Sequence, residues 1–275
     1  MTKKADLHIH TYYSDGTSSP EEVVEDARAA GLSCIAITDH DTLEGVKPTI
    51  EAAKSSGIEV LCGVEVSSSI HGKDVHVLGY LMDYDDEKTR QKLGVIQESR
   101  ISRMKLIVEK LNQLGVDNIT YEEVKAKTQS NSIGRPHLAQ VLVEKGVVPD
   151  IKEAFNRYLA DGAPAFVSVF KQTPYEAIKS IKECGGVAVL AHPMITNVDE
   201  LIPSLVEAGL DGLEAYYPNN GQNVINYYLG LAKKHNLIVT GGSDAHGSAK
   251  KNTSIGRMTV DYEIVESLKA KACMA

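Results

Sequence analysis

The sequence predicts an α/β barrel with a helical insertion, and three observations support this fold class. The chain has 275 residues, of which 43% are hydrophobic and 24% charged, so it has the composition of an ordinary globular protein and enough length for a barrel. In residues 1–84 and 166–275, apolar runs of strand length alternate with amphipathic helical segments, as they do in parallel βαβ units. Residues 85–165 show helical periodicity with many charges instead. We therefore expect a barrel made from the two outer segments, and a helical insertion that contributes to its pocket.

The first strand is expected near the N-terminus, where residues Asp6 to His10 alternate polar and apolar side chains. Residues two apart in a strand point to the same face, so His8 and His10 can bind one metal ion. Asp15 follows in a short polar loop and offers a second kind of ligand. A helix begins at the Ser-Ser-Pro-Glu-Glu sequence of residues 18–22, which combines a hydroxyl cap with proline and acids in the first turn.

Three further strands are expected before the insertion. Residues 33–38 form a nearly continuous apolar run, typical of a buried parallel strand, and lead into an Asp-His-Asp sequence at 39–41. A second helix separates this run from strands at 58–66 and 74–80. The turn between those last two strands is too short for a crossover helix, so we expect them to pair antiparallel and to depart locally from a regular barrel.

Helices dominate the insertion, and strands resume after it. The helical segments are expected at 87–114, 121–127, 136–144 and 151–159. Strands are expected at 187–191, 212–216 and 237–240, each after a helical segment. The same order of strands and helices on both sides of the insertion favours one barrel over two domains.

Composition limits the classes of partner. The formal net charge of −8 argues against a broad basic face for DNA or other long polyanions, although bound divalent ions can reverse the local sign and admit a phosphorylated substrate. No stretch approaches the roughly 20 apolar residues of a membrane-spanning helix, and no apolar region of a signal peptide follows the first lysines. The four cysteines are scattered without a Cys-x-x-Cys pair. We expect reduced thiols in a cytoplasmic protein.

Potential metal ligands recur within or just beyond the ends of the predicted strands. These residues are His8, His10, His40, Glu65, His76, His192, Asp244 and His246. Active sites of parallel α/β proteins assemble at that end of the strands, and neutral imidazole and carboxylate are the ligands that divalent transition metals take. Any one of these histidines is more often a core or surface residue, but chance does not account for the whole series. The sequence therefore predicts a metal site.

The motifs resemble those of the PHP (polymerase and histidinol phosphatase) family. They are Asp-Leu-His-Ile-His-Thr with Ser-Asp-Gly, Ile-Thr-Asp-His-Asp, Gly-Val-Glu-Val, Val-His-Val-Leu-Gly-Tyr, Leu-Ala-His-Pro and Gly-Ser-Asp-Ala-His, in this order over nearly the whole chain. The resemblance implies a distorted, TIM-like (β/α)7 barrel that binds two or three divalent ions, typically Mn²⁺, with Zn²⁺ or Fe²⁺ as alternatives. It also implies metal-dependent phosphoesterase activity.

The resemblance further implies three groups of ligands. His8, His10, Glu65 and Asp244 would bind one ion; Glu65, His76 and His192 would bind a second; Asp15, His40 and His246 would bind the third. Glu65, which bridges two ions, together with His192 and Asp244, would be catalytic. Several ions around one substrate can activate water and stabilise the leaving oxygen, which is the chemistry of metal-assisted phosphoester hydrolysis.

The sequence Gly-Arg-Pro-His-Leu-Ala at 134–139 narrows the expected substrate. A guanidinium group suits phosphate oxygens, although an arginine beside a helix-initiating proline is also common on protein surfaces. The stretch resembles one branch of the family, whose members remove the 3′-phosphate of nucleoside 3′,5′-bisphosphates and trim short RNAs from the 5′ end. The resemblance implies that Arg135 and His137 bind a substrate phosphate.

Three alternatives remain open at this stage: a histidinol-phosphate phosphatase, an amidohydrolase that cleaves C–N bonds, and a non-catalytic module related to the family. The extra Asp15, His40 and His246 count against an amidohydrolase, and the complete ligand series counts against a non-catalytic module. Asp39 and Asp41 are candidates for orienting His40, whereas Glu214 has no assigned role.

Overall fold

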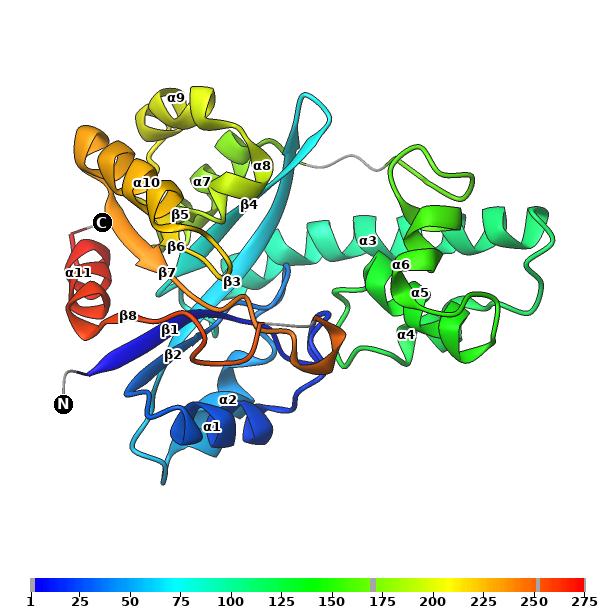
Figure 1. Ribbon diagram of the computed structural model, residues 1–275, viewed down its shortest axis with the longest axis horizontal. Coiled ribbons are helices and arrows are strands. Elements are labelled where there is room, and N and C mark those ends of the chain that lie inside the picture. The colour runs from blue at the N-terminus through cyan, green and yellow to red at the C-terminus, as the bar shows by residue number, and fades with distance from the viewer. Residues whose placement is uncertain (1–2, 169–171, 251–252, 275) are drawn as a thin grey trace.

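The computed structural model describes residues 3–168, 172–250 and 253–274, and within them eight strands form one curled sheet (Figure 1). The strands are β1 (Lys4–Ile9), β2 (Cys34–Ile37), β3 (Glu59–Ile70), β4 (Lys73–Tyr80), β5 (Val187–Leu190), β6 (Gly212–Tyr216), β7 (Ile238–Gly241) and β8 (Val260–Asp261). The α-helices are α1 (Pro20–Ala29), α2 (Val46–Ala53), α3 (Glu87–Gln113), α4 (Tyr121–Lys125), α5 (Arg135–Glu144), α6 (Ile151–Ala154), α7 (Pro174–Glu183), α8 (Pro193–Thr196), α9 (Ile202–Glu207), α10 (Gln222–His235) and α11 (Tyr262–Ala272). Shorter helical turns are η1 (Phe155–Leu159), η2 (Asp199–Leu201) and η3 (Gly247–Ala249).

The strands follow the order β7-β6-β5-β4-β3-β2-β1-β8. Neighbouring strands are parallel, except that β4 is antiparallel to both β3 and β5, and β8 is antiparallel to β1. The two sides of the sheet meet where Ile9 bridges Ala245, and the backbone N–H of His10 donates to the Ala245 carbonyl at 2.9 Å. This nearly closed sheet confirms the predicted α/β barrel, and its distortion includes the antiparallel pairing expected around the short turn after β3.

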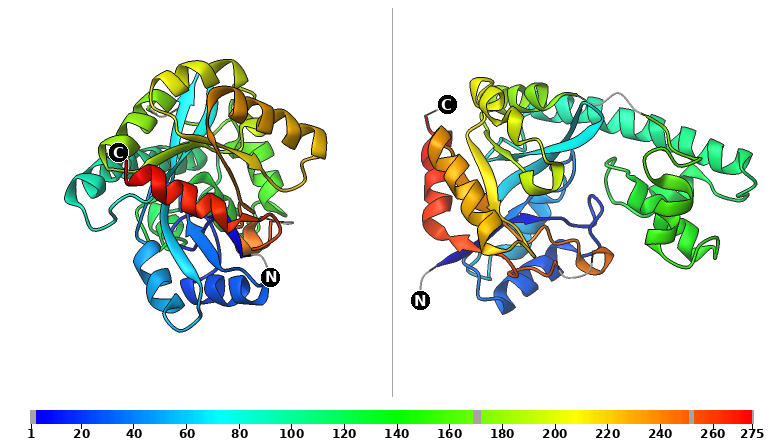
Figure 2. Two further views of the ribbon diagram at one scale, coloured as in Figure 1. Left: turned by 90° about the vertical axis from the view of Figure 1, so that its left-hand side faces the viewer. Right: turned by 45° about the horizontal axis from the view of Figure 1, so that its top comes forward.

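Local sequence explains why these elements form. Helix α1 begins with Ser19 as its cap, Pro20 in its first turn, and Glu22 bonding back to the Ser19 backbone, which satisfies N–H groups that a helix start leaves without partners. Strands β2 and β5 are buried along their whole length because helices cover the outer face of the barrel and side chains fill its interior. Helices α1 and α2 lie on one side of the barrel, and α7, α9 and α10 lie on the other (Figures 1 and 2).

Helix α3 extends away from the barrel, and α4, α5 and α6 pack near its outer part (Figures 1 and 2). It has 27 residues and is therefore about 40 Å long. Leu93 in its first part packs into the core of the barrel, whereas Met104 and Ile107 further along join Leu138 and Leu142 of α5 in a second core. Neither α3 nor any other helix in the described part of the chain is long and apolar enough to cross a membrane.

Candidate metal centre

The barrel gathers the predicted ligand residues in one place. His8 and His10 come from the end of β1. His40 follows β2, and its backbone pairs with that of Glu65 in β3. The others come from β4 and from the segments after β5 and β7, namely His76, His192, Asp244 and His246. Residues more than two hundred positions apart in the sequence therefore meet at one end of the barrel.

The most buried group contains His8, His10, Glu65 and Asp244. The Nε2 atoms of His8 and His10 lie 3.1 Å apart, and they are 3.2 and 3.1 Å from Glu65 Oε2. Asp244 Oδ1 lies 3.6 Å from His8 Nε2 and 3.3 Å from His10 Nε2. Four donor atoms of the types that Zn²⁺ or Mn²⁺ accept thus face one point in space.

The other oxygen of Glu65 faces a second pair of histidines. Glu65 Oε1 lies 2.7 Å from His76 Nδ1 and 2.9 Å from His192 Nε2. Because each carboxylate oxygen of Glu65 points to a different set of imidazoles, the geometry suits a ligand shared between two ions.

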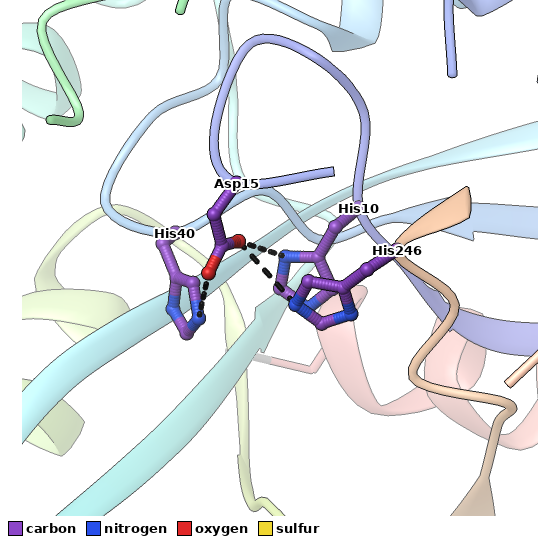
Figure 3. A group of neighbouring side chains, drawn as sticks. All are labelled: His10, Asp15, His40 and His246. Atoms are coloured by element: carbon purple, nitrogen blue, oxygen red, sulfur yellow. Dashed lines mark ion pairs between the residues drawn. The ribbon is translucent and has the colours of Figure 1, made fainter. Parts of the chain in front are cut away.

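Asp15 lies at the centre of a third group. Its Oδ1 atom is 3.3 Å from His246 Nε2 and 3.8 Å from His10 Nδ1, and its Oδ2 atom is 3.9 Å from His40 Nε2. Figure 3 shows the Asp15 carboxylate directed between the ring of His40 and the neighbouring rings of His10 and His246. The loop after β1 therefore brings a carboxylate close to His10 in the same segment and to histidines from two other segments.

The structure connects these groups more closely than the sequence predicts. His10 faces the first group through Nε2 and Asp15 through Nδ1. His40 Nδ1 lies 3.4 Å from Glu65 Oε2 and forms a compact set with Glu65 and His76 as well as with Asp15. The three predicted groups are thus parts of one continuous cluster, in which His10 and His40, like Glu65, each belong to two groups.

The carboxylates of the cluster are ionised despite their burial. Burial alone raises the pKa of Glu65, but His40, His76 and His8 reverse this and hold that pKa well below its ordinary value. The pKa of Asp15 is lowered in the same way, against its burial, chiefly by His246 and His40. Burial lowers the pKa of His40 to about 3, so its imidazole is neutral and its nitrogen lone pair is available. Anionic oxygens beside a neutral imidazole are the protonation states that metal binding requires.

Several potential metal-ligand atoms are buried and have no hydrogen-bond partner in the described residues. They are Asp15 Oδ1, His40 Nδ1 and His192 Nδ1. Buried polar atoms are normally bonded, and each exception needs an explanation. For Asp15 and His40, whose donor atoms converge with those of their neighbours, the residues fit a divalent ion.

Glu214 of β6 has a position that the sequence did not reveal. It is fully buried, its Oε1 atom lies 3.0 Å from His8 Nδ1, and its Oε2 atom accepts the backbone N–H of His192 at 2.9 Å. A carboxylate at Nδ1 keeps the proton on that nitrogen and leaves Nε2 of His8 free as a ligand atom. Its only signal in the sequence is a glutamate within an otherwise apolar strand.

Asp39 and Asp41 support the loops around His40 and do not bond to its ring. Asp39 Oδ1 accepts the backbone N–H of Thr11 at 2.7 Å and the hydroxyl of Ser14 at 2.6 Å, so it orders the loop that carries Asp15. Asp41 accepts the backbone N–H of Ser67 at 2.7 Å and pairs with Arg100 of α3. Both carboxylates thus act on the backbone of the site.

Two residues of the cluster have strained backbones. His192 has φ of 28° and Asp244 has φ of 49°, values in the left-handed region that non-glycine residues rarely adopt. Such strain persists only where surrounding structure enforces it, and it concentrates at functional sites.

A cavity of about 460 Å³ lies between the cluster and the helices after β4. Asp15, His40 and His76 line its barrel side. Its other side includes three cationic residues from α3 and α5, namely Arg100, Arg103 and Arg135, with Phe155 beside them. Its volume falls in the range of small-molecule sites, and its two charged walls suit an anionic ligand that also contacts metal ions.

Arg135 and Arg103 each donate to a backbone carbonyl at the cavity wall, and for Arg103 this is the Nε bond to Val167 at 3.0 Å. Arg135 Nη1 donates to the Leu159 carbonyl at 2.9 Å and to Asp161 at 2.6 Å, and its guanidinium lies 5.7 Å from the Phe155 ring centre. Burial, with Arg135 and Arg100 nearby, lowers the pKa of Arg103 to about 10. An anion between these cations would relieve their mutual repulsion.

His137 lines the same cavity but bonds within the protein through both ring nitrogens. The backbone N–H of Gly134 donates to Nδ1 at 2.9 Å, and Nε2 lies 2.6 Å from the Ser14 carbonyl. Because Nδ1 accepts a hydrogen bond, the ring proton is on Nε2 and is donated to Ser14. Burial lowers the pKa of His137, in keeping with this neutral form.

A barrel that directs imidazole and carboxylate donors into a cavity with a cationic opposite wall defines a metal-dependent hydrolase of phosphate esters. Residues 6–163 match the family model of the PHP domain. The chain belongs to the PHP family, and the fold and the phosphoesterase class predicted from the sequence are confirmed.

Relatives match nearly the whole chain. A 5′-3′ exoribonuclease of Haemophilus influenzae is 36% identical over 90% of this chain and 91% of its own length. A 3′,5′-nucleoside bisphosphate phosphatase of Chromobacterium violaceum is 31% identical over 91% of this chain and 90% of its own length.

Solved structures agree with the fold. A protein of Bifidobacterium adolescentis, provisionally described as a metal-dependent phosphoesterase, superposes with a TM-score of 0.88 at 33% identity, over 97% of this chain and 96% of its own. A protein of Chromobacterium violaceum, described as an amidohydrolase with bound sulfate and no metal, superposes with a TM-score of 0.85 at 30% identity, over 97% and 96% of the two chains.

Proposed function

We propose that this enzyme hydrolyses nucleoside 3′,5′-bisphosphates with release of the 3′-phosphate, and that it also degrades short RNA from the 5′ end. The observation that supports this most is a cavity with potential metal ligands on one wall and Arg100, Arg103 and Arg135 on the other. A substrate with two phosphates matches these two walls, whereas a substrate with one phosphate leaves one wall unused. The named activities of the two relatives support the same substrate class.

We assign two to three divalent ions to the cluster, with Mn²⁺ as the expected metal and Zn²⁺ or Fe²⁺ as alternatives. The first set of ligands is His8, His10, Glu65 and Asp244; the second is Glu65, His76 and His192; the third is Asp15, His40 and His246. When bound, such ions supply an activated water at neutral pH and stabilise charge on phosphoryl oxygens. Glu65, His192 and Asp244 are the proposed catalytic residues; they come from β3 and from the segments after β5 and β7, and they would hold the ions around the reacting phosphate.

The second phosphate is assigned to Arg135. Its guanidinium is fixed by the Leu159 carbonyl, the Asp161 carboxylate and two aromatic rings. A phosphate therefore meets an ordered side chain, and little side-chain entropy is lost. The resemblance to the family also assigned a phosphate to His137. Because both of its ring nitrogens already have partners, a different role is argued for His137 below.

We further propose that residues 85–165 are an insertion into a barrel formed by residues 1–84 and 166–275. The separate core shared by α3 and α5 and the arginines that these helices contribute to the cavity support this division. We place the enzyme in the cytoplasm, as the cysteine pattern predicts.

The decisive experiment compares four substrates at equal Mn²⁺ concentration. They are adenosine 3′,5′-bisphosphate, histidinol phosphate, a short 5′-phosphorylated RNA and an N-acyl amino acid. We expect phosphate release from the bisphosphate and mononucleotide release from the RNA. Release from histidinol phosphate alone would overturn the substrate assignment, and cleavage of the amide alone would show that the amidohydrolase description of the structural neighbour applies here.

A further inference from the structure

The segment between α4 and α5, together with His137 of α5, bonds directly to the two loops that carry Asp15 and His40. Thr128 and Gln129 bond to the Tyr12 carbonyl, and Ser130 bonds to the Tyr13 carbonyl. Next in the same loop, the Ser14 carbonyl accepts from His137 at 2.6 Å. On the neighbouring loop, the Ser132 hydroxyl donates to the carbonyl of His40. All these partners are backbone carbonyls, and they lie immediately before Asp15 or in His40 itself.

A bond to the Ser14 carbonyl controls where Asp15 points. The Ser14 carbonyl and the N and Cα atoms of Asp15 belong to one planar peptide unit, so a partner that holds the carbonyl also holds the two backbone atoms from which the Asp15 side chain is placed. His137 is 1% exposed, and its contact with Ser14 at 2.6 Å is a short one. The other ring nitrogen accepts a hydrogen bond from the Gly134 backbone. The imidazole therefore connects the start of α5 to the Asp15 loop through two hydrogen bonds.

We propose that His137 is a positioning residue for the third metal site, and that it acts through the Ser14 carbonyl on Asp15 and does not bind substrate phosphate directly. The inference rests on the ligand assignment of the proposed function. It makes the third site dependent on α5, because His137 bonds to the carbonyl of the residue before Asp15.

Two substitutions of similar size separate this role from others. In His137→Gln, the amide nitrogen reaches the place of Nε2 and can still donate to Ser14. In His137→Asn, the shorter amide reaches only the place of Nδ1, so the bond to Gly134 is kept and the bond to Ser14 is lost. We expect His137→Asn to lower the affinity for the third Mn²⁺ by about 10- to 100-fold, the range seen when supporting residues of metal sites are removed. His137→Gln should restore most of that affinity.

The measurement is calorimetric titration of the metal-free full-length protein with Mn²⁺, with bound metal counted by mass spectrometry. Ser132→Ala removes the hydrogen bond to the His40 carbonyl and so tests the same site from the His40 side. It should lower the affinity for the same ion. Lys127→Ala is the matched control, because the Lys127 side chain pairs with Glu144 at the protein surface, and metal binding by this variant should equal that of the wild type. Circular dichroism establishes that each variant is folded.

The outcomes distinguish the inference from the proposed function. If His137→Asn binds all ions with wild-type affinity while the KM for the bisphosphate rises in both His137 variants, His137 is a substrate ligand and the inference is wrong. If the wild-type protein hydrolyses the bisphosphate with two bound ions only, the inference fails and the proposed function stands. If the wild type binds no Mn²⁺, the metal assignment itself fails.

Discussion

Replacement of Glu214 by glutamine should weaken metal binding without creating a cavity in the core, because the two side chains have nearly the same size. The backbone N–H of His192 needs an acceptor, so the amide oxygen of the new side chain will face it and the amide nitrogen will face His8 Nδ1. A donor at that position keeps Nδ1 unprotonated and moves the ring proton to Nε2, the atom that lies 3.2 Å from Glu65 and 3.1 Å from His10 Nε2. The metal must then displace the proton from His8 Nε2, and this lowers the affinity for the metal.

The expected loss follows from the burial of this contact. Glu214 and His8 are both 0% exposed, so no solvent competes for the misplaced proton, and removal of such a supporting carboxylate reduces metal affinity by about 10- to 100-fold, or about 1.4 to 2.8 kcal/mol. Calorimetric titration with Mn²⁺ should show this loss at the site of His8, with the same number of ions bound at saturation. Equal affinities in wild type and Glu214→Gln would refute the idea that Glu214 sets the tautomer of His8.

Three other predictions concern the substrate clamp, the protons of the site and the cysteines. Arg135→Ala removes charge-assisted hydrogen bonds of roughly 1.5–3 kcal/mol, so the KM for adenosine 3′,5′-bisphosphate should rise about 10- to 100-fold. The KM for a simple phosphate monoester should stay near that of the wild type. An equal change in KM for both substrates would contradict the role of Arg135 in binding the second phosphate. Burial opposes the charge on His10, but hydrogen bonds that His10 donates to Asp244 and Glu65 outweigh this effect and raise the pKa of His10 to about 9. The metal-free protein therefore holds this proton at pH 7. Mn²⁺ binding should release the proton and strengthen as pH rises from 7 to 9, which calorimetry in buffers of different ionisation enthalpy will detect as a buffer-dependent heat, and a buffer-independent heat would argue against it. Burial raises the pKa of Cys34 and of Cys62 to about 12. At pH 8 a thiol reagent should therefore modify exposed Cys273 rapidly in the folded protein, and Cys34 and Cys62 only after unfolding. Rapid modification of either buried thiol would show that the barrel opens readily.

Much of the fold was determined by the sequence, because the relevant information is local. The alternation of residues 6 to 10 and the continuous apolar runs of β2 and β5 predict strands from neighbouring residues alone. The short turn between β3 and β4 predicts their antiparallel pairing. By contrast, β3 extends to Ile70 beyond its predicted end at residue 66, since pairing with β4 stabilises residues whose own sequence is polar.

The chemical type of the site was also determined by the sequence, whereas its connections were decided by the tertiary structure. Imidazoles and carboxylates at strand ends indicate a metal site whatever their exact spacing. That His40 approaches Glu65 as well as Asp15 depends on the pairing of β2 with β1 and β3, which brings these segments together only after the chain has folded.

The supporting residues came from the tertiary structure alone. Glu214 and Arg103 carry no sequence motif, and their importance arises from what faces them: the Nδ1 atom of His8 in one case and a cavity with two further arginines in the other. His137 has a motif, but its two hydrogen bonds are set by the packing of α5 against the Asp15 loop. Sequence patterns thus determine which chemical groups are present, and only the folded backbone decides the direction of each hydrogen bond and the distance between donors, because those depend on contacts between residues remote in the chain.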